Sequence, residues 1–129
     1  MPQDRESGAR ASRYGHDCGE RIAVALGTRL LGAASNECVV NGESVVIKCA
    51  RRTTTKVGVS YKMVNTLDAV LGAFEDANGS YRVLRLCARR CADLMDAEPT
   101  ASHGPSAGKV GMVRRAVFEQ EGTLVAIIP

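Results

Sequence analysis

The sequence contains no tryptophan, and aromatic residues make up only 4% of the chain. A hydrophobic core must therefore be built mainly from Val, Leu, Ile, Ala and Met. The longest apolar stretches, 45–47 and 124–129, are far shorter than the roughly 18 residues that span a bilayer. Residues 1–17 also lack the apolar segment of a secretory signal. We therefore expect a cytoplasmic protein that does not span a membrane.

Cysteine is present, but without a paired motif. The five cysteines are Cys18, Cys38, Cys49, Cys87 and Cys91, and no two of them form a CxxC pair. An odd number of cysteines without a secretory leader favours reduced thiols over a disulfide framework. We expect most of them to be small core residues. Cys87 and Cys91 would share a metal only with ligands from elsewhere in the chain.

The chain length of 129 residues fits one domain. Hydrophobic residues make up 45% and charged residues 24%, which is ordinary for a globular protein. Residues 1–16 mix acidic and basic side chains without an apolar core, so they are predicted to form a disordered arm. The folded domain is then predicted to cover residues 17–129.

The spacing of apolar residues predicts an α+β fold. Asn41-Gly42 between two β-rich runs is the strongest short-range signal for a hairpin. The expected elements are, in order, a helix over 17–31, strands over 36–40, 43–51 and 56–61, a helix over 62–77, a strand over 81–86, a helix over 87–95, a loop over 98–108, and a closing hairpin of strands over 110–119 and 123–128.

The predicted hairpin carries a lysine within an apolar strand. A two-residue turn pairs Glu37 with Val46, which puts Glu37 and Lys48 on one face as diagonal neighbours. Burying an unpaired lysine is costly, so Lys48 needs a carboxylate or phosphate partner. A lysine beside acids can stabilise charge developing on a phosphate while the acids hold Mg²⁺. In the alternative reading, Lys48 extends to the end of the sheet and pairs with Glu37 for packing reasons alone.

The net charge is +3, and the basic residues are clustered. One fifteen-residue stretch, 48–62, contains five basic residues and no acid. Arg82, Arg85, Arg89 and Arg90 form a second group. The two groups either line one binding surface or form ordinary solvated faces.

The order of elements over residues 17–86 resembles the αβββαβ core of the PD-(D/E)XK, or restriction-endonuclease-like, superfamily. This resemblance implies a single α+β domain with a central mixed sheet flanked by helices. It also implies hydrolysis of DNA phosphodiester bonds that depends on Mg²⁺ or Mn²⁺, with RNA as the alternative substrate, in an enzyme that often works as a homodimer.

The resemblance also implies roles for individual residues. Glu20 matches the helical acid of many members, Glu37 (or Asn36) falls where the first metal-binding acid belongs, and Lys48 matches the final lysine. Glu20 and Glu37 would then bind the metal, and both would act with Lys48 in catalysis. The acid expected two residues before the lysine is replaced by Val46, so the triplet is Val46-Ile47-Lys48.

Further basic residues occur where phosphate contacts are expected. They are Arg51, Arg52 and Lys56 after the hairpin, with Arg114 and Arg115 near the C-terminus. Three hypotheses follow for the function of the chain. It is a metal-dependent endonuclease, a nuclease-like nucleic-acid-binding or regulatory module without catalysis, or a protein-interaction domain in which Lys48 only packs.

Overall fold

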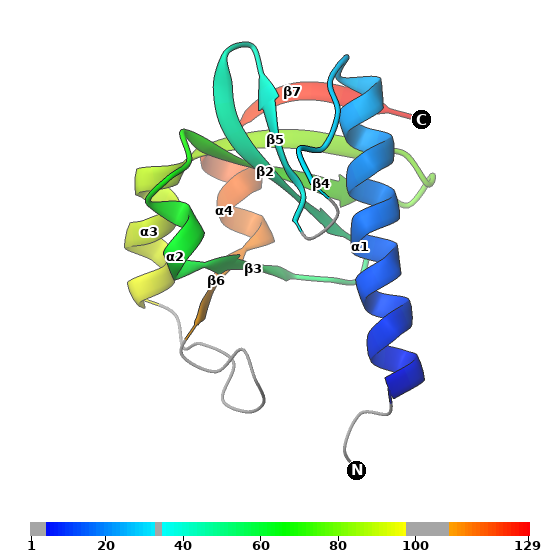
Figure 1. The fold of residues 1–129 in the computed structure, drawn as a ribbon, viewed down its shortest axis with the longest axis horizontal. Helices are drawn as coiled ribbons and strands as arrows, with labels where there is room; N and C mark the ends of the chain where they lie inside the picture. Colours follow the sequence, from blue (N-terminus) through cyan, green and yellow to red (C-terminus); the bar gives the residue numbers. More distant parts are fainter. Residues whose placement is uncertain (1–4, 33–34, 98–108) are drawn as a thin grey trace.

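The computed structural model of the protein describes residues 5–32, 35–97 and 109–129 (Figure 1). The elements are, in chain order, α1 (Arg5–Ala25), β1 (Glu37–Val40), β2 (Glu43–Ala50), β3 (Lys56–Ser60), α2 (Tyr61–Val64), β4 (Ala69–Glu75), β5 (Tyr81–Cys87), α3 (Ala88–Ala97), β6 (Val110–Arg114), α4 (Arg115–Glu121) and β7 (Thr123–Ile128). None of the described helices is long and apolar enough to cross a membrane. The loop predicted over 98–108 lies outside the described residues.

A five-stranded mixed sheet forms the centre of the domain, in the order β1-β2-β4-β5-β7. β2 and β4 run parallel, and the other neighbours run antiparallel. In Figure 1, α1 lies on one side of this sheet, and α2, α3 and α4 lie on the other with a second, two-stranded sheet of β3 and β6. The expected α+β class with a mixed sheet is therefore confirmed.

β2 is apolar on both of its faces because each face contributes to a different core layer. Val45 and Ile47 point toward α1 and pack with Ile22. Val46 and Ala50 point the opposite way, into the layer that also contains Phe74 and Phe118. A strand buried on both sides shows no polar alternation, and β2 is indeed central, between β1 and β4.

The hairpin of β1 and β2 has the predicted turn and register. Asn41 and Gly42 take φ values of 51° and 80°, as a two-residue hairpin turn of this type requires. Glu37 pairs with Val46, as the sequence predicts. Glu37 and Lys48 therefore share one face of the sheet.

Helix α1 differs from its prediction at both ends. Residues 5–16 were expected to form a disordered arm, but the helix already begins at Arg5. It ends at Ala25, well before Leu31. There the backbone N–H groups of Gly27 and Thr28 donate to the carbonyls of Val24 and Ala23, which closes the helix in a Schellman motif.

The helix predicted over 62–77 is wrong beyond its first turn. Only α2, Tyr61–Val64, is helical, and Ala69–Glu75 forms the strand β4. Six of the seven residues of β4 are buried because the strand lies between β2 and β5 with core on both faces. The closing hairpin predicted from strands over 110–119 and 123–128 is also wrong. β6 ends at Arg114 and α4 follows directly, β6 pairs with β3, and β7 pairs with β5.

The third strand, β3, is not part of the central sheet. The elements from α1 to β3 follow the start of the predicted αβββαβ order. After α2, in contrast, β4 lies in the segment predicted to be helical, and the predicted fourth strand over 81–86 is β5. However, β3 does not join the five-stranded sheet and pairs instead with β6. This second sheet brings the residues that follow the hairpin next to a segment from near the C-terminus.

Candidate functional site

The five basic residues that were predicted to contact phosphate gather at one end of the molecule. Lys56 lies directly opposite Arg114 in the pairing of β3 with β6. Arg115 follows Arg114 and bonds back to the chain after β2, since its guanidinium donates to the carbonyls of Arg51 and Arg52 at 3.4 Å. We call this group of Arg51, Arg52, Lys56, Arg114 and Arg115 the basic edge.

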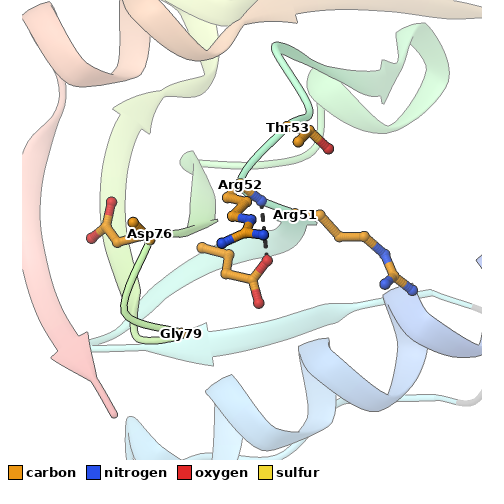
Figure 2. Close-up of a pocket in the computed structure, with 7 residues that line it drawn as sticks. Arg51, Arg52, Thr53, Asp76 and Gly79 are labelled. Atoms are coloured by element: carbon orange, nitrogen blue, oxygen red, sulfur yellow. Dashed lines mark hydrogen bonds between the residues drawn. The ribbon is translucent and has the colours of Figure 1, made fainter.

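A pocket of about 420 Å³ opens beside the basic edge (Figure 2). Its walls are the loop after β2 and the turn between β4 and β5, with Arg51, Arg52, Thr53, Glu75, Asp76, Ala77 and Gly79 as the lining residues. The backbone N–H of Arg52 donates to Oε1 of Glu75 at 3.1 Å and fixes the two walls to each other. Guanidinium and hydroxyl donors of this kind can bind the oxygens of a phosphate.

Arg115 is the structural member of the basic edge. Its side chain is only 14% exposed and lies 3.7 Å from carboxylate oxygens of both Asp76 and Glu119. It also donates to the carbonyl of Glu75 at 3.1 Å and lies over the ring of Phe74. These contacts connect α4 to both walls of the pocket, so Arg115 holds the two walls in position.

Replacing Arg115 with alanine is therefore expected to destabilise the fold. Arg115→Ala should lower the free energy of unfolding by about 2 kcal/mol, because several charge-assisted hydrogen bonds and the packing on Phe74 are lost together. Urea denaturation followed by circular dichroism measures the change. Arg89→Ala, at an exposed position on α3, is the control and should change stability by less than about 0.5 kcal/mol. Equal effects of the two variants would contradict this role.

Most arginines of the second basic group are neutralised by acids from other elements. Arg82 pairs with Asp76 and Glu119, Arg85 with Glu43, and Arg90 with Glu121, at 2.7–2.9 Å. These residues therefore connect elements of the fold.

Arg51 and Arg52 differ from that group because neither forms an ion pair with a described residue. The guanidinium of Arg51 lies 4.1 Å from the ring centre of Tyr14 on α1, and Figure 2 shows the side chain extending toward that helix. Among the described residues, Arg52 forms hydrogen bonds only through its backbone: its N–H donates to Glu75, and its carbonyl accepts from Arg115. The two guanidinium groups keep their capacity to bind an external anion.

The residues predicted to catalyse hydrolysis are only partly brought together. Glu37 and Lys48 share a face of the sheet. Lys48 is partly buried, and this burial lowers the pKa of its ammonium group. Lys48 forms no ion pair with the residues described.

Glu20 lies on the other side of the sheet. It is an exposed residue of α1, which packs on the face formed by Val45 and Ile47, away from Lys48. Glu20 instead lines a separate pocket with His16 and Arg29. Across the described ranges, no three His, Cys, Asp or Glu side chains are grouped so that they could hold a metal ion. A metal site made jointly by Glu20 and Glu37 does not fit this arrangement.

Sequence reasoning missed a polar cluster between α1 and the sheet. Tyr14 and Tyr81 share a hydrogen bond of 2.7 Å between their hydroxyls, and the side chains of Cys18 and Cys49 lie in the same layer. Tyr14 falls within the predicted disordered arm, so the sequence gives no reason to expect its contact with Tyr81. No sequence motif connects these four residues, so the sequence does not indicate that they lie close together.

No protein-family model matches this chain, and no curated protein matches it. Its function must therefore be inferred from the residues themselves.

Proposed function

We propose that this protein binds nucleic acid through the basic edge. One observation carries the proposal: Arg51 and Arg52 lack a carboxylate partner among the described residues, whereas Arg82, Arg85 and Arg90 each have one. The acids of the fold thus neutralise Arg82, Arg85 and Arg90 and leave Arg51 and Arg52 available. A guanidinium without a carboxylate is well suited to bind phosphate in a bidentate manner.

The proposed ligand is double-stranded DNA, with RNA as the alternative outcome of the test. Contacts from arginine and lysine to phosphate position a protein on the duplex but carry no sequence information. The pocket beside Arg51 and Arg52 offers room for one backbone phosphate next to the hydroxyl of Thr53. Two carboxylates also line it, but Asp76 is paired with Arg82 and Arg115, and Glu75 accepts from the backbone N–H of Arg52. We therefore expect binding with little sequence preference.

The test is the salt dependence of binding. With two to four phosphate contacts, the affinity for a labelled DNA duplex should fall roughly 10- to 100-fold between 50 and 200 mM salt. Fluorescence anisotropy measures the dissociation constant at each salt concentration, and an RNA duplex is measured in parallel. If neither nucleic acid is retained at 50 mM salt, the proposal fails, and a protein-interaction domain is the hypothesis that remains.

A second candidate function is a nuclease resembling the PD-(D/E)XK superfamily. It is favoured by the shared face of Glu37 and Lys48, where the lysine lacks an acidic partner within the described part of the chain. Because Glu20 lies across the sheet, Glu37 is the only predicted metal ligand on that face.

Cleavage assays with Mg²⁺ and with Mn²⁺ test this second function. Cleavage is expected to be abolished by Lys48→Ala and by Glu37→Ala. The matched control is Glu20→Ala, which should leave cleavage unchanged because its carboxylate lies on the opposite side of the sheet. If a clean preparation cuts neither DNA nor RNA with either metal, only the binding function stands.

A further inference from the structure

Cys18 and Cys49 face each other between α1 and β2. Cys49 is on the same face of β2 as Val45 and Ile47, which is the face that α1 covers. Cys18 is buried in this layer and belongs to the same cluster of packed side chains as Cys49. Tyr14, one turn before Cys18 on α1, contacts Arg51, two residues after Cys49, so the same stretches of helix and strand lie side by side. Two thiols that are 31 positions apart in the sequence are thus neighbours in the fold.

Asn36 connects the helix backbone to the strands at this point. Nδ2 of Asn36 donates to the carbonyl of Gly15 on α1 at 2.9 Å and to that of Ile47 on β2 at 3.2 Å. A Cβ atom at Gly19 would collide with the Asn36 side chain. The absence of a side chain at Gly19 lets α1 approach Asn36, and Cys18 is the residue next to Gly19 in the sequence. Close backbones are what a bond between two cysteine sulfurs requires.

The surroundings of the two thiols give them different reactivity. Interaction with the Cys49 side chain is the main cause that lowers the pKa of Cys18, and it outweighs burial. The side chains of Tyr81 and Tyr14 and the charge of Arg21 lower it further. Interaction with Cys18 and burial raise the pKa of Cys49. Of the two thiols, Cys18 is therefore the one that more readily forms a thiolate, which is the nucleophilic form.

A small oxidant can reach Cys18 through a pocket of about 270 Å³. The pocket is lined by Tyr14, Asp17, Cys18, Arg21 and Tyr81. The other cysteines have no such arrangement. Cys38 and Cys91 are buried, and burial raises the pKa of both thiols. Cys87 is exposed and lies outside the layer between α1 and β2.

We propose that Cys18 and Cys49 are a thiol pair that hydrogen peroxide oxidises to a reversible intramolecular disulfide. The Cys18 thiolate attacks one peroxide oxygen, the O–O bond breaks, and hydroxide leaves, which yields a sulfenic acid on Cys18. The Cys49 thiol then attacks the Cys18 sulfur, an S–S bond forms, the S–O bond breaks, and water leaves. The two thiols lose two electrons in total, and peroxide is reduced to two molecules of water.

Peptide mapping of the oxidised full-length protein tests the proposal directly. Trypsin places each of the five cysteines in a different peptide, so two of these peptides stay joined only if a disulfide links them. Cys18 falls in the peptide 14–21, Cys49 in 49–51 and Cys38 in 30–48. After treatment with a small excess of hydrogen peroxide and alkylation of the remaining thiols, we expect a cross-linked peptide that joins 14–21 to 49–51. Dithiothreitol should return both peptides to the reduced, alkylatable form.

Two variants assign the roles of the thiols. In Cys49→Ser the disulfide cannot form, and dimedone should label Cys18 as a trapped sulfenic acid. Cys87→Ser, the matched control, should leave the cross-link unchanged. The proposal is overturned if peroxide oxidises Cys87 while Cys18 and Cys49 stay reduced, or if Cys18 pairs with a different cysteine. The wild-type map decides this even if a variant fails to fold.

The thiol pair and the basic edge are adjacent, because Tyr14 contacts both Arg51 and Tyr81. The peptide map contains no nucleic acid, however. Failure of the disulfide proposal therefore leaves the binding proposal untouched, and the reverse also holds.

Discussion

Val46→Asp is expected to unfold the domain and not to complete a metal site. The substitution would restore the acid that the resemblance to PD-(D/E)XK nucleases places two residues before Lys48. Val46 is only 1% exposed and packs in the same core layer as Phe74 and Phe118. A carboxylate in that layer would lose its hydration without gaining a hydrogen-bond donor or cation in return. The free energy of unfolding should therefore fall by about 4 kcal/mol or more. Urea denaturation followed by circular dichroism measures the loss.

The matched control for this variant is Val39→Asp. Val39 is on β1 and on the same face of the sheet as Glu37, but it is 44% exposed. The same change of side chain there should alter stability by less than about 1 kcal/mol. The opposite result would be a Val46→Asp protein as stable as the wild type that gains Mg²⁺-dependent cleavage. Position 46 would then be open to solvent and metal, and the nuclease hypothesis would be favoured over binding without catalysis.

The hairpin could be predicted in detail because its information is local. Asn41 and Gly42 both accept a positive φ, and a two-residue turn leaves one register for the strands on either side. The shared face of Glu37 and Lys48 follows from that register alone. The position of Glu20 relative to them could not be predicted, because nothing local says which face of the sheet α1 covers.

Strand β4 shows why the centre of the sheet was mistaken for a helix. Met63, Leu67, Val70, Leu71 and Phe74 have the spacing of a core-facing helical stripe. In the structure the apolar residues from Ala69 to Phe74 are buried on both faces of β4, so they show no alternation that would identify a strand. The segment forms a strand and not a helix because it pairs with β2 and β5. These partners come from other parts of the chain, so the local sequence does not reveal them.

The candidate site could be predicted as a set of basic residues but not as a surface. From the sequence, Arg85 and Arg90 are as suitable for phosphate binding as Arg51 and Arg52. The difference between them depends on acids far along the chain, such as Glu43, which lies 42 positions from Arg85. Tertiary structure thus decides which arginines are neutralised, and this separates the proposed interface from the other basic group.

Reversing the charge of Arg51 and Arg52 together is expected to weaken nucleic-acid binding roughly 100-fold at 50 mM salt, because two phosphate contacts and their counterion release are lost. The slope of affinity against salt should fall by about two at the same time. Neither guanidinium forms an ion pair with a described residue, so the fold should tolerate the change. Fluorescence anisotropy across a salt series measures both quantities. Thermal melting checks that the double variant, which loses the contact of Arg51 with Tyr14, is still folded.

The matched control reverses two exposed arginines outside the basic edge. Arg29 lies in the loop after α1 and Arg89 near the start of α3. The double variant Arg29→Glu with Arg89→Glu changes the net charge by the same amount. If binding depended on net charge alone, both double variants would weaken it equally, and the basic edge would have no special role. If binding is local to the basic edge, the control loses only a few-fold in affinity and keeps its salt slope, because distant charges are screened beyond about 10 Å at 0.1 M salt.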